Sequence, residues 1–218
     1  MNIDLSPAGK TYLVRRLPGS KAQSVAASLA DAEVAGISTI NWKEFSHAPR
    51  VSFQAGYDQR QLHLRYTVTA NAVLAKYAYE NEPVYQDDCV EFFMATEHGE
   101  YINFEFNCIG TILAQRGRSR QDRIFLTIDE LAQVKILSSL PKEPINPERQ
   151  GPISWNLNIS IPLFLLRIAK DPAGRQFRAN FYKCGDDMSQ VHYLSWNPIA
   201  TPAPDFHRPE FFGTLIFE

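Results

Sequence analysis

Five segments of this chain alternate apolar and polar side chains with a period of two, and this alternation limits the fold more than any other feature of the sequence. Successive side chains of a β-strand point to opposite faces, so each segment is typical of a strand with one buried face. The segments are residues 61–70, 89–94, 101–108, 153–161 and 175–184. In YINFEFNC, residues 101–108, the apolar side is Ile102, Phe104, Phe106 and Cys108, and the polar side is Tyr101, Asn103, Glu105 and Asn107.

Half-buried strands separated by turn residues are typical of antiparallel sheets rather than parallel α/β sheets. The predicted fold class is all-β: an antiparallel β-sandwich of the immunoglobulin-like or jelly-roll kind with a few short helical turns. Helical spacing is confined to residues 20–30, with Ser20 as a candidate N-cap, and to residues 128–137 and 162–169. Residues 139–152, which contain several prolines, are predicted to form a surface loop. Because no internal repeat is present, residues 1–218 are predicted to form one domain.

Charge and cysteine usage argue against several classes of protein. The chain has 22 basic and 24 acidic residues, a net charge of −2, which argues against nucleic acid as the main partner. Cys89, Cys108 and Cys184 are odd in number and widely spaced, which argues against a disulfide framework. We expect a monomer.

The beginning of the chain bears on its compartment. MNIDLSPAGKTYLVRRLPGS lacks the apolar core of a secretion signal, and no stretch of the chain approaches the roughly 18 apolar residues of a membrane span. The sequence therefore predicts a cytoplasmic protein if Met1 is native, and an extracellular or periplasmic one if a leader was removed.

The stretch VYQDDCVEFFM, residues 84–94, places three acids at the mouth of an apolar run. Glu91 falls on the non-core side of its strand by parity, directly after Asp87 and Asp88, and three uses of these acids stay open. A glycoside hydrolase could use two of Asp87, Asp88, Glu91 and Glu105, at a carboxyl separation of roughly 5 to 10 Å. The carboxylates could instead hold sugar hydroxyls. In the third use, Asp87–Asp88 or Asp186–Asp187 contributes to a calcium site.

Two further features suit sugar binding. The polar side of residues 101–108 presents hydrogen-bonding groups about 7 Å apart, which suits sugar hydroxyls as well as plain solvent. Trp196 precedes Asn-Pro and a proline-rich loop, where an indole is expected to stay partly exposed and to stack on a sugar ring. Capping of the core by this indole is the alternative.

The order of several motifs resembles a known family. From Trp42 to Glu218 the motifs are NWKEF, LHLRYTVT, YQDDCVEFFM, YINFEFNCIGT, an arginine-rich turn, WNLNISIP, FRANFYKC and SWNP…FHRPEFFGTLIFE. This arrangement resembles the family 9 carbohydrate-binding modules and their stand-alone relatives in the DOMON-like superfamily. The block D-D-x-V-E-F-F, together with the FRANFY and SWNP…FHRPEFFG endings, carries the resemblance.

The resemblance implies a β-sandwich without catalytic machinery that clamps a glycan, a plant-type polysaccharide fragment or its chain end, between two aromatic rings. The rings would be Trp196 and Tyr85, which stands where the family has tryptophan, and Glu91 would hold hydroxyls. The basic partners would be Arg116 or Arg118, and Arg178 or Lys183. The resemblance implies no required cofactor, and it leaves structural calcium at Asp87 and Asp88 open.

Two other functions stay open beside this one. A small glycoside hydrolase, or an accessory fragment of a xylan-degrading enzyme, would show turnover that disappears in Glu91→Gln. A structural or protein-interaction sandwich would bind no glycan and would bury Trp196 against its own loop.

Overall fold

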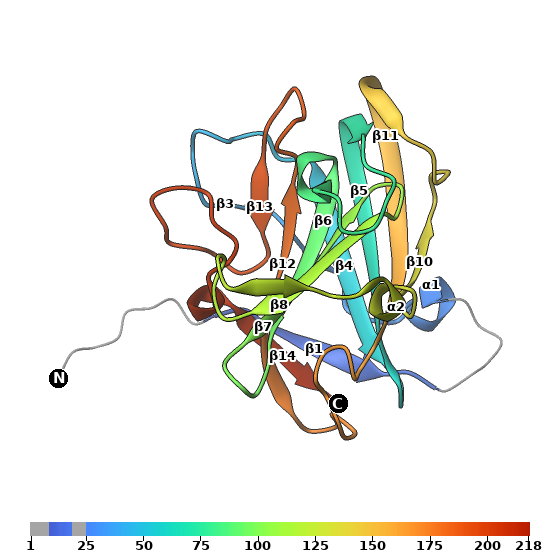
Figure 1. Cartoon of the computed structure of the whole chain (residues 1–218), viewed down its shortest axis with the longest axis vertical. Helices are drawn as coiled ribbons and strands as arrows, with labels where there is room; N and C mark the ends of the chain where they lie inside the picture. Colours follow the sequence, from blue (N-terminus) through green and yellow to red (C-terminus); the bar gives the residue numbers. More distant parts are fainter. Residues whose placement is uncertain (1–8, 19–24) are drawn as a thin grey trace.

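Two β-sheets packed face to face form the computed structural model, which describes residues 9–18 and 25–218 (Figure 1). The strands of the first sheet are β3 (Thr39–Ile40), β6 (Cys89–Ala95), β7 (Tyr101–Asn107), β8 (Ile112–Gly117), β9 (Arg123–Phe125), β12 (Gln176–Cys184), β13 (Tyr193–Ser195) and β14 (Gly213–Phe217). Their order is β14-β12-β6-β7-β8-β9, with β13 beside β12 and β3 beside β13.

The strands of the second sheet are β2 (Ala35–Gly36), β4 (Arg50–Tyr57), β5 (Gln61–Ala75), β10 (Lys135–Ser138) and β11 (Ile145–Pro162). Their order is β10-β11-β5-β4, with β2 beside β4. These strands form the right-hand layer of Figure 1, where the long strands β5 and β11 lie side by side.

Strand β1 (Thr11–Arg16) connects the two sheets. Its residues 11–14 pair in parallel with β14, and its residues 15–16 pair in parallel with β4. The other pairings between the strands of the described chain are antiparallel. The predicted all-β sandwich is confirmed, and each of the five alternating segments lies in a strand to within one residue at its ends.

The helical elements of the described residues are single turns. They are α1 (Val25–Ser28), α2 (Ile128–Leu131) and the 3₁₀ turns Val84–Gln86 and Pro209–Phe211. A capping box starts α2, because the Thr127 hydroxyl accepts the Glu130 N–H and the Glu130 carboxylate accepts the Thr127 N–H. Of the helical segment predicted over 128–137, only this first turn forms, and its end enters β10. Residues 163–167 form consecutive turns, and Ser20 lies outside the described residues.

The prediction of a surface loop over residues 139–152 is wrong for the second half of this segment. Strand β11 already begins at Ile145, and it pairs with β5 through two register shifts that precede Ile153. Proline cannot donate to a ladder, but it is tolerated at such irregularities and on an unpaired edge. Pro147 and Pro152 therefore lie within β11, and the proline content of the segment is the reason that the sequence predicts a loop there.

Aromatic side chains fill the space between the sheets. The ring of Phe53 on β4 stacks on the ring of Phe181 on β12, with centroids 3.6 Å apart. The indole of Trp196 meets both rings edge-on at centroid distances of 5.8 Å and is 3% exposed. Buried aromatic residues dominate the energy of such cores. Trp196 is therefore part of the interior that holds the two sheets together.

A second apolar cluster covers the opposite face of β6, β7 and β12. Its buried members are Trp42, Val84, Cys89, Phe93, Tyr101, Leu113, Tyr182, Cys184, Ile199, Phe206 and Phe212. At its centre the Tyr182 ring stacks on Phe206 at 4.2 Å, and the Tyr182 hydroxyl donates to the Phe206 carbonyl. Both faces of the three strands are covered, so their polar side chains lie beneath loops instead of on an open sheet.

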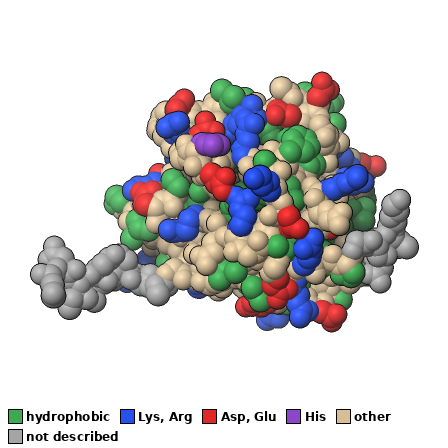
Figure 2. Space-filling model, turned by 90° about the horizontal axis from the view of Figure 1, so that it is seen from below, with side chains coloured by type: hydrophobic (Ala, Val, Ile, Leu, Met, Phe, Trp, Pro, Cys, Tyr) green, Lys and Arg blue, Asp and Glu red, His purple; other side chains and the backbone are tan. Residues whose placement is uncertain are grey.

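The surface agrees with the near balance of charge in the chain. On the face drawn in Figure 2, basic and acidic side chains are intermingled. Within residues 9–18 and 25–218, the structure has no helix whose length and apolar character would suit a membrane crossing.

The packing of Trp196 requires glycine at position 213. A Cβ added there would lie 2.6 Å from Cζ3 of the indole and 2.7 Å from the carbonyl oxygen of Lys10. Both distances are far inside van der Waals contact, and the rings of Phe53 and Phe181 leave the indole little room to move. The first position of β14 is therefore closed to any side chain.

We expect Gly213→Ala to lower the free energy of unfolding by about 1–3 kcal/mol, the usual cost of overpacking a filled core. The matched control is Gly36→Ala on β2, where an added Cβ meets only the Ser38 hydroxyl at 3.6 Å. Urea denaturation followed by tryptophan fluorescence measures both variants. Equal stability of the two would contradict the packing described for Trp196.

Candidate functional site

A cavity of about 440 Å³ opens on the face of the first sheet that the second apolar cluster covers. The carboxyl groups of Glu91 on β6 and Glu105 on β7 line it, together with the thiol of Cys184 on β12. Tyr85, in the 3₁₀ turn before β6, and Tyr193, the first residue of β13, also line it. Tyr85 is 38% exposed, so the cavity combines an accessible aromatic surface with buried acids.

The two glutamates form a pair across adjacent strands. They stand directly opposite each other in the β6–β7 ladder and are 3% and 4% exposed. The Asn103 amide donates to Glu105 Oε1 at 3.0 Å, and the Cys184 thiol donates to Glu91 Oε1 at 3.1 Å. The other oxygen of Glu105, Oε2, has no hydrogen-bond partner. The pair therefore has hydrogen-bonding capacity that the protein does not use.

Burial shifts the ionisation of both glutamates. Loss of solvent raises the pKa of Glu105 to about 7, although the nearby Arg123 guanidinium lowers it in part. Burial and then the charge of Glu105 raise the pKa of Glu91 well above its ordinary value. Two carboxyls this close do not both ionise readily. Around neutral pH the pair retains a proton, so it offers a donor as well as acceptors.

Tyr85 is held by the loop that follows β12. Its carbonyl oxygen accepts the backbone N–H of Asp186 at 3.3 Å, which ties the turn at residues 84–86 to this loop. The Asp186 carboxylate bonds the Tyr193 phenol, and burial raises the pKa of Asp186 to about 6. The Tyr193 ring also packs edge-on against Phe45 at 4.9 Å. The Tyr193 ring is therefore anchored by Phe45 and Asp186, and the backbone of Tyr85 is tied to the loop after β12.

Two arginines reach the cavity from the hairpin between β8 and β9. The Nη1 of Arg123 donates to Asn103 Oδ1 at 3.2 Å and lies 3.0 Å from Nδ1 of His207. Burial and the arginine charges lower the pKa of His207 to about 3, so its ring is neutral and accepts this bond. Arg120 pairs with Asp205 at 3.9 Å. Because Asn103 bridges Arg123 to Glu105, the arginine also orients the buried acid.

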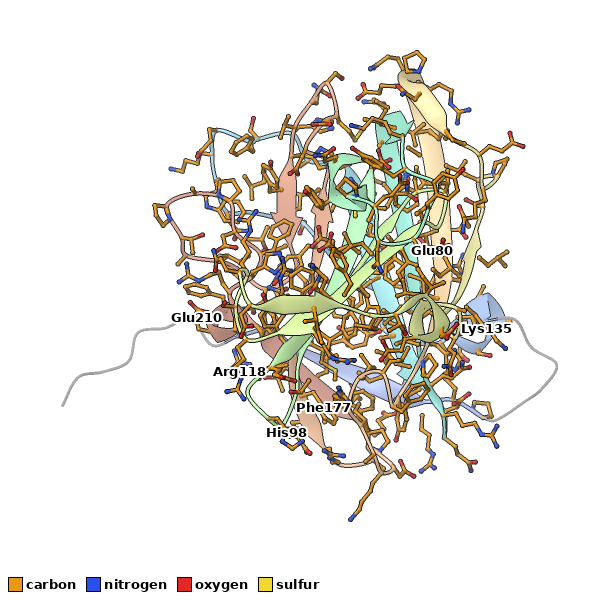
Figure 3. All side chains as sticks on the ribbon, viewed as in Figure 1. Glu80, His98, Arg118, Lys135, Phe177 and Glu210 are labelled. Atoms are coloured by element: carbon orange, nitrogen blue, oxygen red, sulfur yellow. The ribbon has the colours of Figure 1, made fainter. Side chains whose placement is uncertain are left out.

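The structure brings only part of the predicted site to this cavity. Tyr85 and Glu91 line it, whereas the arginine-rich turn contributes Arg120 and Arg123 instead of Arg116 or Arg118. Arg116 points to the other side of β8 and pairs with Glu130 at 3.0 Å. Figure 3 shows Arg118 at the margin of the molecule, where it is exposed.

The remaining predicted residues are held elsewhere in the fold. The Arg178 guanidinium donates to the carbonyl oxygens of Phe212 and Gly213. The expectation that Trp196 is partly exposed is wrong, because its indole lies between the sheets. The predicted clamp of Tyr85 with Trp196 therefore does not form, and Tyr193 is the second ring at the cavity. Burial of Trp196 was expected of a sandwich without ligand, but the indole packs on the inter-sheet core and the cavity forms without it.

Lys183 is an interior residue, so its predicted role as a sugar contact does not fit its position. Its ammonium group is fully buried and lies 2.6 Å from Oδ1 of Asp88. The same nitrogen donates to the Cys184 carbonyl at 2.7 Å and lies 2.8 Å from Nε2 of His192. A second bond to Asp88 comes from the indole of Trp155, at 2.8 Å. Buried charges require such pairing.

Asp87 is likewise bound by protein groups. Its carboxylate accepts the N–H groups of Lys76 and Tyr77 at 2.8 and 3.2 Å and the Asn107 amide at 2.9 Å. These bonds fix the turn into β6. Calcium binding at Asp87 and Asp88 stays a prediction.

A different trio of side chains has the spacing of metal ligands. The donor atoms of Cys89, Glu91 and Cys184 all lie within 4.8 Å of one another below the cavity. Burial raises the pKa of Cys89 to about 12 and that of Cys184 well above its ordinary value. A cation would have to displace these protons. In their protonated form the thiols act as buried hydrogen-bonding groups.

Sequence reasoning missed several residues of the cavity. Tyr193 stands three positions before Trp196, but its strand, β13, is too short to show an alternation of apolar and polar side chains. Glu105 was considered as a hydrolase acid and as part of the polar side of residues 101–108 that suits sugar hydroxyls, but it was not named among the ligand-binding residues. Asp186 was considered only as a calcium ligand and Arg123 only as part of the arginine-rich turn, and for His207 the sequence carries no signal beyond residue type.

We expect the stability of the protein to fall as pH rises through the titration of Glu105. Its folded pKa of about 7 exceeds the ordinary 4.5, so between these values the folded state binds more protons than the unfolded state. Wild type should lose about 3 kcal/mol more than Glu105→Gln between about pH 4.5 and pH 8. Urea denaturation across this range measures the difference.

The control for this experiment is Glu44→Gln, which replaces an exposed glutamate outside the cavity. Its stability should follow that of wild type at every pH. If the stability of wild type and that of Glu105→Gln changed in parallel with pH, Glu105 would titrate in the folded protein as it does in the unfolded chain, which would contradict the prediction.

Comparisons with known proteins bear on this cavity. The model of the family described as carbohydrate-binding family 9 matches residues 22–217, beginning before the first sequence motif at Trp42. No match was found among curated proteins. A crystal structure from Bacteroides uniformis, of a protein provisionally assigned as carbohydrate-binding, is 36% identical and has a TM-score of 0.90, over 97% of this chain and 100% of that chain.

Two solved structures of a family 9 carbohydrate-binding module from Caldicellulosiruptor kristjanssonii share the fold. The complex with cellotriose is 14% identical, with a TM-score of 0.62 over 96% of this chain and 94% of that chain. The complex with glucose is 15% identical, with a TM-score of 0.59 over 96% of each chain.

Proposed function

The chain belongs to carbohydrate-binding family 9, whose modules bind carbohydrates without catalysing a reaction, and on this premise we propose that its cavity holds the end of a glycan between Tyr85 and Tyr193. The single observation that carries the proposal is the convergence of two tyrosines and two buried carboxyl groups on one cavity. The geometry supports each part of this arrangement in a different way.

The two phenol rings would supply the apolar contact. A pyranose presents C–H groups on its faces, and an aromatic ring offers a large, rigid surface to them. Asp186 bonds the Tyr193 phenol and Phe45 packs against the Tyr193 ring, whereas the hydrogen bond at Tyr85 fixes the backbone from which its ring projects. Because these contacts already order the Tyr193 ring, little of its side-chain freedom remains to be lost on binding.

The polar groups would supply hydroxyl recognition. A sugar hydroxyl donates one hydrogen bond and accepts others. The half-protonated pair of Glu91 and Glu105 offers both functions, and the unpartnered Glu105 Oε2 gains the partner that it lacks in the free protein. Arg123 adds a charged donor at the edge of the pair. Hydrogen bonds that involve charged groups are the stronger ones, at about 1.5–3 kcal/mol each.

The size of the cavity favours a short ligand. Its volume of about 440 Å³ lies in the lower part of the roughly 300–1,000 Å³ range of small-molecule pockets. One or two sugar rings suit such a site better than an internal stretch of a long chain. The complexes of the Caldicellulosiruptor kristjanssonii module with cellotriose and glucose make β-linked glucose the first ligand to test, a plant-type glycan.

The placement of the acids does not suit a hydrolase. Glycosidase carboxyls flank the scissile bond from two sides of a cleft. Glu91 and Glu105 are instead neighbours on one face of one sheet, below the cavity. This arrangement agrees with the non-catalytic character of the family.

We expect Tyr85→Ala and Tyr193→Ala each to weaken binding of cellotriose about fivefold or more, because a stacked ring contributes about 1 kcal/mol beyond its buried area. Tyr79→Ala is the matched control, since this tyrosine is 74% exposed and does not line the cavity. Titration calorimetry with glucose, cellobiose, cellotriose and xylotriose measures the affinities, and circular dichroism confirms that each variant is folded. Wild-type affinity in both folded cavity variants would refute the proposal.

A further inference from the structure

The charges that line the cavity are not balanced. Arg120 and Asp205 pair with each other, and their side chains are 59% and 27% exposed at the outer edge. The remaining carboxyls, Glu91, Glu105 and Asp186, face the single guanidinium of Arg123 among the lining residues of the described chain. The cavity therefore carries more acid than base.

Neighbouring basic groups do not correct this excess. Lys183 is buried below the sheet face with Asp88 as its ion-pair partner, and Lys76 pairs with Asp187 at the surface. The His207 ring is neutral, as its lowered pKa of about 3 requires. The phenols of Tyr85 and Tyr193 and the thiol of Cys184 add no positive charge.

Hydrogen bonding at the acid pair is also incomplete. Glu105 is 4% exposed, lines the cavity and has an oxygen, Oε2, without a partner. Glu91 Oε1 accepts only from a thiol, which is a weak donor. Buried polar atoms of this kind are nearly always satisfied in native proteins. A group with several N–H donors and a positive charge would complete both carboxyls at once.

We propose that the cavity prefers a sugar with a free, protonated amino group, a hexosamine, over the matching neutral sugar, with the ammonium group on the carboxyls of Glu91 and Glu105. This inference rests on the proposed function, since it names the class of sugar that the same cavity selects. An ammonium group has three donors and no acceptor, which matches acceptors without partners. The raised pKa values of the two glutamates have the same origin as the preference, namely burial that the nearby charge of Arg123 offsets only in part.

Related sugars fit this arrangement less well. A uronic acid would add a further carboxylate beside the three acids, and like charges repel in a buried site. An N-acetylated hexosamine keeps the nitrogen but has a neutral amide in place of the ammonium group. The predicted order of affinity is therefore the free hexosamine first and the uronic acid last.

Titration calorimetry near neutral pH with glucosamine, glucose, N-acetylglucosamine and glucuronic acid tests the proposal. We expect glucosamine to bind about tenfold more tightly than glucose, because charge-assisted hydrogen bonds are about twice as strong as neutral ones. Equal or weaker binding of glucosamine, with glucose still bound, overturns the preference and leaves the proposed function intact. Failure of every sugar to bind overturns both.

The variant Glu105→Gln tests whether the preference for glucosamine arises at the carboxyl pair. In Glu105→Gln the ratio of glucosamine affinity to glucose affinity should fall to about one, whereas the exposed Glu44→Gln should keep the wild-type ratio. Lowering the pH of wild type from about 7 to about 4.5 should reduce the same ratio, because the carboxyl pair then gains protons. A glucosamine preference that survives both the variant and the acid condition would place the amino group elsewhere and overturn the assignment.

Discussion

The antiparallel register between β6 and β7 is the constraint on which the cavity depends. It sets Glu91 opposite Glu105 and, at the next position, Phe92 opposite Phe104 on the other face. A slip of one residue in either strand would exchange these faces, because side chains alternate along a strand. The aromatic rings between the sheets therefore hold the acids in place, since a slip of one residue would bury carboxyls in the main core.

Holding two acids under a protein surface is unfavourable, and the fold offsets this cost only in part. Asn103 and Cys184 each donate one hydrogen bond, and a retained proton removes one of the two charges. Nearby, the buried Asp88 has a direct ion-pair partner, because the Lys183 ammonium lies 2.6 Å from its Oδ1, and the Trp155 indole donates to its other oxygen. Within the described residues, Glu91 and Glu105 have no ion pair of this kind, and on our proposal the ligand takes that place.

Much of the fold could be predicted from the sequence, because strand alternation is a local signal. The segments around Glu91 and Glu105 were assigned to strands with the correct buried side, and Tyr85 and Glu91, both predicted as ligand-binding residues, line one cavity. The role of Trp196 could not be predicted, since its exposure depends on where a loop meets Phe53, more than one hundred positions away in the chain. The choice of Arg123 over Arg118 depends on hairpin geometry, which residue type does not encode.

The connection made by β1 has a consequence for the order of events during synthesis. Thr11, near the start of the chain, pairs with Thr214, near its end, and the same strand continues into the opposite sheet. Such distant contacts slow folding, because a long loop must close before the contacts form. During synthesis on the ribosome, β1 therefore cannot connect the two sheets until β14 has emerged.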